Sequence, residues 1–237
     1  MHHRALKPVI SLFAALSLLT AVGCAGLTEF LDNSGLGSEQ PQLVAGIKQT
    51  LELSSTRAAD TLSTPGGYAN DPLLRITMPE QAQAITSTLR QFGMGRYVDR
   101  VESLMNQGAE QAASEAKDMF ITAVRNMTVT DALDIVRGDD TAATRYFRTQ
   151  TESGLRQRYQ PIIRSNLEQV GFYDQYRLML DVYNTLPVRN RPNLDLEDYV
   201  LNQSLDGLFT RVASEEALIR QDPIGRGSQL IGSVFNR

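Results

Sequence analysis

Residues 114–127 have the sequence SEAKDMFITAVRNM, in which apolar side chains recur every three or four positions. This spacing places them on one face of an α-helix, whereas a half-buried β-strand would show apolar residues at every second position. The apolar face consists of Ala116, Met119, Phe120, Ala123, Val124 and Met127. The stretch therefore predicts an amphipathic helix that packs one face into a protein core.

The same helical spacing recurs on both sides of this stretch, and no run of alternating apolar and polar residues interrupts it. Thr128 and Asp131 fit a capping box at the start of one helix. Pro161 is expected to kink or divide another, because its ring clashes with the preceding turn. A first helix is expected to start at Ser38. The other expected helices cover residues 80–92, 96–112, 128–138, 139–170, 172–185, 195–220 and 223–235. We therefore expect an all-α fold, a single-domain bundle of several helices.

Residues 63–79 break the helical pattern and predict one irregular, Pro/Gly-rich loop, or a β-like segment. Within this segment, Arg75 could bind a carboxylate or phosphate through two hydrogen bonds, with Tyr68 and Asn70 orienting the ligand. The alternative is that Asn70, Asp71 and Pro72 form a turn, while Arg75 pairs with a helix carboxylate and fixes the loop. We favour the alternative, and we keep Tyr68, Asn70 and Arg75 as a candidate binding site.

Asp139 and Asp140 form a second candidate site, between Gly138 and Thr141. Two adjacent carboxylates in a loop could bind Ca²⁺ or Mg²⁺. However, Asp is also a favoured residue at the start of a helix, and Gly at the end of one. The surrounding residues do not fit the 12-residue calcium-binding loop, so we favour the capping role and expect neither a metal nor a cofactor.

The first 23 residues have the features of a secretory signal peptide. Arg4 and Lys7 form a basic start, residues 9–19 are apolar, and the small residues Ala21 and Gly23 follow. The apolar stretch is shorter than the roughly 20 residues that span a bilayer comfortably. We therefore expect residues 1–23 to be removed, and no transmembrane helix in the mature chain.

Cys24 is the only cysteine of the chain, so it has no partner for an internal disulfide. Together with residues 21–23 it resembles the bacterial lipoprotein signal, in which the cysteine becomes the lipidated first residue. The alternative is a simple secretory signal that is cut nearby and leaves a free thiol. Ala25 follows, where aspartate would favour retention in the inner membrane. We expect lipidated Cys24 at the periplasmic face of the outer membrane, a flexible tether over 24–37 and a helical domain over 38–237.

Cleavage after residue 23 also removes His2 and His3, the only histidines. Without histidine or a free thiol, the mature chain could form neither a Ser–His–Asp triad nor a zinc site made of His or Cys. The loss of Arg4 and Lys7 changes the net charge from −4 to −6, which gives no electrostatic reason to bind nucleic acid.

Several blocks of the sequence are together similar to one known family. These blocks are Gly67–Pro72 with Arg75-Ile76 and Met78–Glu80, Glu115–Phe120 with Met127-Thr128 and Asp131–Leu133, Gly138–Thr144 with Tyr146-Phe147, Asp195–Val200, and Ala213–Glu216 with Ile219-Arg220 and Pro223. Over roughly residues 35–236 the chain resembles the bacterial DUF4197 proteins, a family of unknown function. The resemblance implies an exported helical domain and implies no activity.

The expected function is that of a membrane-tethered periplasmic lipoprotein without enzymatic activity, whose domain binds an envelope protein or supports the envelope. One alternative is a helical carrier of an apolar or lipid-like ligand, enclosed by aromatic residues that are otherwise expected in the core. These residues are Tyr97, Tyr146, Phe147, Phe172, Tyr176 and Tyr183. A second alternative is a hydrolase that uses carboxylates such as Glu152, Glu215 and Glu216, and we name no catalytic residue.

Overall fold

The computed structural model describes residues 36–186 and 195–235. The expected signal peptide, Cys24 and the tether up to residue 35 lie outside the described residues. The chain divides into two compact units, Met1–Gln42 and Leu43–Arg237. Of the first unit, only residues 36–42 are described, as the first residues of a helix. The second unit contains the rest of the fold.

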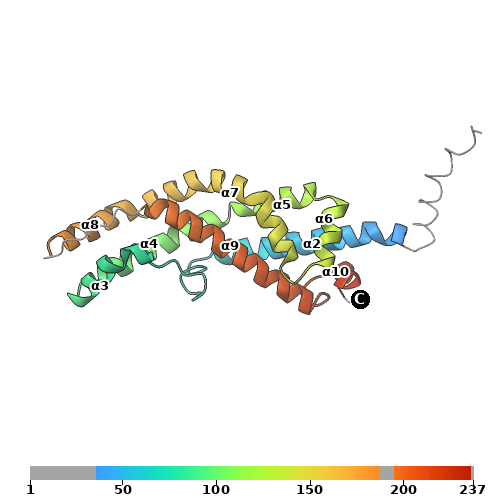
Figure 1. The fold of residues 1–237 in the computed structure, drawn as a ribbon, viewed down its shortest axis with the longest axis horizontal. Helices are drawn as coiled ribbons and strands as arrows, with labels where there is room; N and C mark the ends of the chain where they lie inside the picture. Colours follow the sequence, from blue (N-terminus) through green and yellow to red (C-terminus); the bar gives the residue numbers. More distant parts are fainter. Residues whose placement is uncertain (1–35, 187–194, 236–237) are drawn as a thin grey trace, which may run out of the picture. The chain divides into compact units, whose positions relative to one another are not determined.

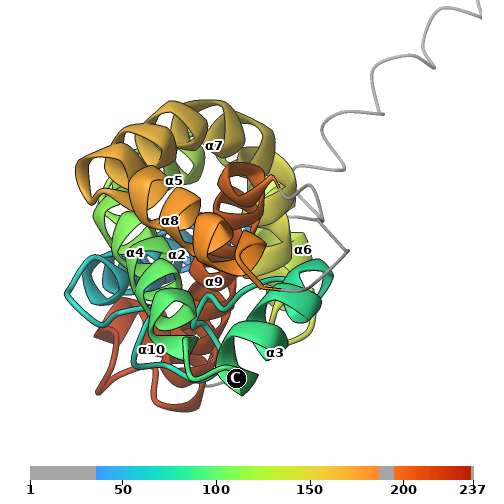
Figure 2. The same ribbon diagram turned by 90° about the vertical axis from the view of Figure 1, so that its left-hand side faces the viewer.

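The described residues form helices joined by loops and contain no β-strand, which confirms the all-α prediction (Figure 1). The elements are α2 (Leu36–Leu62), the short 3₁₀ helix η1 (Glu80–Ala82), α3 (Gln83–Gln91), α4 (Gly95–Ala113), α5 (Ala116–Asn126), α6 (Val129–Arg137), α7 (Ala142–Gln169), α8 (Phe172–Asn184), α9 (Leu196–Gln221) and α10 (Gln229–Phe235). The long helices α7 and α9 pack against each other, and α4 contacts α7, α8 and α9 (Figure 2). Within the described ranges, no helix is both long enough and apolar enough to cross a membrane.

The helix predicted from residues 114–127 is α5, and its apolar face points into the core as expected. Phe120 is completely buried at the centre of an aromatic cluster. The centre of its ring lies 5.2 Å from that of Phe147 in α7 and 5.8 Å from that of Phe209 in α9. Tilted and edge-on ring pairs at these distances stabilise a core beyond the area that they bury. The stretch therefore joins three helices that are distant in the sequence.

One helix that could have been divided is continuous, and one expected helix start was wrong. Residues 142–169 form one helix through Pro161, so the proline does not divide it. The last helix begins at Gln229 and not near residue 223, because the Asp222 carboxylate accepts a hydrogen bond from the Gly225 amide (3.0 Å) and closes a turn. The Ser228 hydroxyl then accepts one from the Ile231 amide (3.2 Å) and caps the helix.

The capping box at Thr128 and Asp131 is confirmed: each side chain accepts a hydrogen bond from the other residue's backbone amide. The start of α7, in contrast, is capped from a distant part of the chain. The fully buried Glu216 carboxylate of α9 accepts hydrogen bonds from the Thr144 amide (3.0 Å) and hydroxyl (2.7 Å). Its other oxygen accepts two from Arg220 (3.0 and 2.8 Å). A buried carboxylate thus satisfies an amide of the first turn and neutralises a largely buried cation.

Residues 63–79 form a structured loop, as expected, and one face of α4 holds this loop in place. Asn106 accepts a hydrogen bond from the Ile76 amide (2.9 Å) and donates one to the Ile76 carbonyl (2.7 Å). Glu102 accepts one from the Met78 amide (2.9 Å). We call Glu102, Asn106 and Glu110, which lie four residues apart on α4, the α4 ladder.

Glu110, the third member of the α4 ladder, holds the other end of the loop. One of its carboxylate oxygens accepts hydrogen bonds from the amides of Tyr68 and Ala69, both at 3.2 Å. The Tyr68 ring is completely buried, and its hydroxyl donates to the Ser204 carbonyl of α9 at 2.7 Å. The loop has no strand beside it, so these side chains provide the partners that its buried backbone groups require.

Replacing Asn106 with Leu should strongly destabilise the protein. The apolar side chain has a similar size, but the buried amide and carbonyl of Ile76 would lose their partners, at a cost of about 3 kcal/mol in the free energy of unfolding. Urea unfolding of both proteins measures the difference. Gln111→Ala, an exposed change on the same helix, is the control and should stay within about 0.5 kcal/mol of the unchanged protein. Equal stability of Asn106→Leu would contradict the role of the ladder.

Gly207→Ala and Gly154→Ala should have opposite effects on the free energy of unfolding, although both glycines lie inside helices. A Cβ atom on Gly207 would lie 2.6 Å from Cε1 of the buried Tyr68 ring, whereas one on Gly154 would meet only the Met119 methyl group at 3.8 Å. Alanine gains about 1 kcal/mol in helix propensity at either position. At 207 the overlap and the disturbed hydrogen bond to Ser204 outweigh this gain, and we expect a net loss of about 2 kcal/mol.

Thermal unfolding of the two glycine variants measures this difference. Gly154→Ala should raise the midpoint and Gly207→Ala should lower it. If both variants were stabilised, the close packing of Tyr68 against α9 would be refuted.

Candidate functional site

The structure does not bring the polar groups of Tyr68, Asn70 and Arg75 together. The Tyr68 hydroxyl lies in the core on Ser204, and burial raises its pKa well above the usual value. Asn70 and Arg75 are exposed, and only Asn70 lines the cavity described below. Tyr68 therefore fixes the loop to α9 and is not placed to orient a ligand at the surface.

The turn that we favoured for this segment is present. The Asp71 carboxylate accepts a hydrogen bond from the Leu73 amide (2.9 Å), and the Asp71 carbonyl accepts one from the Arg75 amide (2.8 Å). Among the described residues, Arg75 makes no ion pair with a helix carboxylate. The backbone of the loop is thus fixed by Asp71 and the α4 ladder.

A cavity of about 480 Å³ lies between this loop, the end of α2 and α9. We call it the loop pocket. Its lining includes Leu62, Pro65, Asn70, Asp71, Leu74 and Arg211. Both charged and apolar side chains therefore face the same space, which is typical of a small-ligand site.

Arg211 is the notable residue of the loop pocket. One of its terminal nitrogens lies 3.1 Å from the Glu215 carboxylate, one turn further along α9. Its Nε atom is buried, yet among the described residues it has no hydrogen-bond acceptor. A buried donor without a partner lowers the stability of a folded protein by about 1–3 kcal/mol, so such groups are rare.

Asp71 and the end of α2 also line the loop pocket. One oxygen of Asp71 is used by the Leu73 amide, and its second oxygen has no donor among the described residues. The last residues of α2, Thr61 and Leu62, also line the cavity. The carbonyl end of a helix carries a partial negative charge. The second oxygen of Asp71 is therefore an acceptor that no described residue uses, whereas the Thr61 carbonyl already accepts a hydrogen bond from the Thr64 hydroxyl at 2.7 Å.

At the other candidate site, Asp139 organises the turn before α7. Its carboxylate accepts hydrogen bonds from the Thr141 amide and hydroxyl, both at 2.9 Å, and from Arg145 at 2.9 and 2.8 Å. These donors, Arg145 first, lower the pKa of Asp139 to about 2. Asp140 is exposed and makes no hydrogen bond or ion pair in the described part of the chain. Neither aspartate is the N-cap of α7, which is Thr141, so that expectation was wrong, while Glu216 satisfies an amide of the first turn.

The described residues contain no group of three or more His, Cys, Asp or Glu side chains that could hold a metal ion. The carboxylates named for hydrolysis are each engaged by arginine. Glu152 pairs with Arg148 at 3.1 Å, and Glu215 and Glu216 pair with arginines on α9. None of the three lines the loop pocket.

The aromatic residues considered for an apolar ligand lie in or against the packed core. Phe147, Phe172 and Tyr183 are buried, and the others pack partly buried against the same cluster. The Phe172 ring stacks on Tyr176 with 5.9 Å between ring centres. Most of these rings therefore pack against each other in the interior, and Tyr146 alone of the six lines a cavity, of about 350 Å³, beside Asp131 and Ile135.

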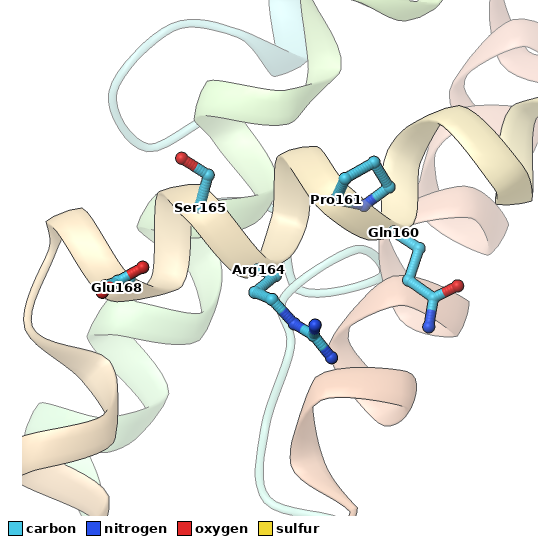
Figure 3. Close-up of a pocket in the computed structure, with 5 residues that line it drawn as sticks. All are labelled: Gln160, Pro161, Arg164, Ser165 and Glu168. Carbon is cyan, nitrogen blue, oxygen red and sulfur yellow. The ribbon is translucent and has the colours of Figure 1, made fainter.

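A separate groove of about 410 Å³ runs along α7 near Pro161 (Figure 3). Figure 3 shows Gln160 and Arg164 extending from one side of the helix and Ser165 from the other. Arg164 is already paired with Glu197 of α9 at 3.0 Å. All the lining residues come from one helix and do not converge, so the groove is a weaker candidate than the loop pocket.

The residues that form the loop pocket were only partly visible in the sequence. Asn70 and Asp71 stand in a turn-rich segment, which marks a loop. Arg211 and Glu215 have the four-residue spacing of a helical ion pair, but that pattern is common on solvent-facing helices. Nothing local shows that Arg211 lies beside a loop about 140 positions earlier in the chain.

Comparisons with known proteins give a family but no activity. No similar protein was found among curated proteins or solved structures. Residues 37–236 match the family model described as "Protein of unknown function (DUF4197)". Two of the blocks that carried the resemblance, Gly67–Pro72 and Ala213–Glu216, contribute to the loop pocket and to the ion pair behind it. The chain therefore belongs to the DUF4197 family.

Proposed function

We propose that the protein is a membrane-tethered lipoprotein of the bacterial cell envelope and that its helical domain is a non-enzymatic binding module. The observation that carries the tether is the sequence of residues 21–24, with small residues directly before the only cysteine. Ala25 favours the periplasmic face of the outer membrane. The loop pocket supports the binding role.

Lipidation of Cys24 would provide enough apolar surface for stable attachment. Each buried CH₂ group contributes about 0.8 kcal/mol, and a single acyl chain gives only marginal, reversible binding. A diacylglyceryl group on sulfur and an acyl chain on the new N-terminus together provide more than the single acyl chain that gives only marginal binding. The helical domain itself then needs no membrane-binding surface.

The binding role is supported by how firmly the loop pocket is built. The α4 ladder and Tyr68 fix the backbone of the loop from both sides, and Gly66 has a φ of 86°, which a residue with a Cβ adopts only with strain. A site that is already ordered loses little entropy on binding. The arginine-paired carboxylates, in contrast, offer no general acid or base for catalysis.

Cys24→Ser should release the protein from membranes into the soluble periplasmic fraction. Because Cys24 is the only cysteine, a thiol-reactive polymer reports its state without ambiguity. Lipidated protein should show no gel shift with this reagent, since its sulfur is a thioether. Fractionation and labelling of the unchanged protein test the proposal together.

Ala25→Asp is the matched control, because it keeps the cysteine and should stay membrane-bound. We expect it to move from the outer to the inner membrane on a density gradient. A thiol that reacts in the unchanged protein, or an unchanged membrane fraction for Cys24→Ser, would rule out the lipid anchor.

A further inference from the structure

We propose that a cavity between the loop and α4 binds a primary ammonium group, with the Glu110 carboxylate as its counter-ion. The cavity has a volume of about 310 Å³, and we call it the α4 pocket. This inference names a class of ligand for the proposed binding module and rests on that role. It depends neither on the lipid anchor nor on the loop pocket. The lining of the α4 pocket includes Ser63, Pro65 and Ala69 of the loop and Ser103, Gln107 and Glu110 of α4.

Glu110 is an exception among the nearly buried glutamates of the described residues. It is 8% exposed, and within the described ranges it makes no ion pair. A charged side chain is seldom buried without a partner of opposite charge. The other three buried glutamates each have such a partner, namely Glu102 with Arg90 (3.9 Å), Glu215 with Arg211 (3.1 Å) and Glu216 with Arg220 (2.8 Å).

Hydrogen bonds from the backbone do not take the place of this cation. Glu102 accepts one from the Met78 amide, and it still has an arginine beside it. Glu216 accepts one from the Thr144 amide and is likewise paired with an arginine. The two loop amides that bind Glu110 therefore do not explain why this carboxylate has no cation.

The second carboxylate oxygen of Glu110 is open to a ligand. The first, Oε1, accepts both hydrogen bonds from the loop, at the amides of Tyr68 and Ala69. Because Ala69 and Glu110 both line the α4 pocket, the carboxylate lies at the wall of this cavity. Among the described residues Oε2 has no donor, yet it is not one of the fully buried atoms without a partner, which are Tyr159 Oη and Arg211 Nε. Oε2 therefore has surface that a ligand can reach.

The charge and geometry of the site favour an ammonium group over other cations. Glu110 is the one charged residue that lines the α4 pocket, so a single positive charge balances it. A guanidinium group binds best across both oxygens of a carboxylate, but two amides already use Oε1. Ca²⁺ takes about six to eight oxygen ligands, and the described residues contain no group of three or more acidic, His or Cys side chains that could hold a metal ion. An ammonium group needs one carboxylate oxygen and has two further N–H groups for neutral acceptors.

The rest of the lining suits an ammonium group on a short alkyl chain. Ser103, Gln107 and Gln111 are exposed residues of the lining whose side-chain oxygens can accept the remaining N–H groups. Pro65 and Ala69 add apolar surface, along which an alkyl chain can lie while its charged end reaches the carboxylate. The volume of about 310 Å³ lies at the lower end of the usual range for small-ligand sites. The ligand class is therefore a primary amine on an unbranched chain, as in a lysine side chain or a free diamine.

The test is an NMR titration of the isotopically labelled full chain carrying Cys24→Ser, which removes any dependence on the anchor. The probe is n-butylammonium chloride, with sodium chloride added to keep the ionic strength constant. We expect saturable shifts of the Tyr68 and Ala69 amides, which share the Glu110 carboxylate with the probe, and a dissociation constant of about 1 mM. n-Butyltrimethylammonium has the same chain and charge but no N–H, and it should bind about tenfold more weakly.

Glu110→Gln tests the counter-ion, because it keeps an oxygen for the two loop amides and removes the charge. Butylammonium should then bind about tenfold more weakly. Glu102→Gln is the matched control, since it is the same change on the same helix and keeps an oxygen for the Met78 amide. Glu102 does not line the α4 pocket, so this variant should bind the probe as the unchanged chain does.

Two changes at the exposed residue Gln107 test the site without touching a contact to the loop backbone. Position 107 lies three residues before Glu110, so the two side chains are neighbours on α4. Gln107→Lys supplies an ammonium group from the chain itself and should weaken probe binding about tenfold, whereas Gln107→Glu adds a negative charge and should strengthen it severalfold. These opposite effects keep the proposal testable even if Glu110→Gln does not fold.

Two further probes identify the source of the ammonium group. N-acetyl-lysine-methylamide represents a lysine side chain of a partner protein, and cadaverine represents a free diamine. Tighter binding of the lysine derivative would assign the site to a protein partner, and tighter binding of cadaverine would assign it to a small amine. Either result supports the ammonium site.

The proposal would be overturned by the absence of a saturable shift up to about 20 mM butylammonium, by equal binding to Glu110→Gln, by equal binding of n-butyltrimethylammonium, or by equal effects of the two Gln107 variants. A saturable shift with calcium chloride but not with butylammonium would assign the site to a metal ion and refute the amine. Each result comes from a chain without the anchor. An α4 pocket that binds no probe, together with a confirmed lipid on Cys24, would therefore reject the ligand and leave the tether in place.

Discussion

The two hydrogen bonds between the Asn106 side chain and the backbone of Ile76 are the contact on which the loop of residues 63–79 depends. They give an irregular segment the same pairing that a neighbouring strand would give it, but from the side of a helix. Glu102 and Glu110 extend this pairing along α4. A polar row on a buried helix face is tolerated here because every member of the row has a backbone partner.

This arrangement explains how an all-helical protein can hold a rigid, non-helical segment. Loops usually lie on the outside of a protein, where water satisfies their backbone groups. In this protein, side chains of α4 instead bind the backbone of the loop, and Tyr68 attaches the loop to α9. The segment between these two attachments places Asn70 and Asp71 in the lining of the same cavity as Arg211.

Local patterns in the sequence predicted most of the fold but little of the site. The face of α5 and the capping box at Thr128 depend on residues within one or two turns of each other, so their spacing is sufficient evidence. Tyr68 was considered as a residue that could orient a ligand because it stands near Asn70 and Arg75 in the turn-rich segment. Its actual partner, Ser204, lies 136 positions away, and no local pattern contains that information. For the same reason, the sequence did not show that Glu216 accepts a hydrogen bond from the Thr144 amide in the first turn of α7, because the two residues lie 72 positions apart.

The pairing of Glu216 with Thr144 also has a consequence for how the chain acquires its structure. The first turn of α7 obtains this acceptor only after α9 has docked, and the loop that contains Tyr68 likewise needs α9 in place. Contacts between such distant positions slow folding, because a long loop must close before they form. The loop pocket is therefore completed late and exists only in the fully assembled domain. Occupancy of the site and survival of the folded state are thermodynamically linked, so a bound ligand would protect the whole domain against unfolding and proteolysis.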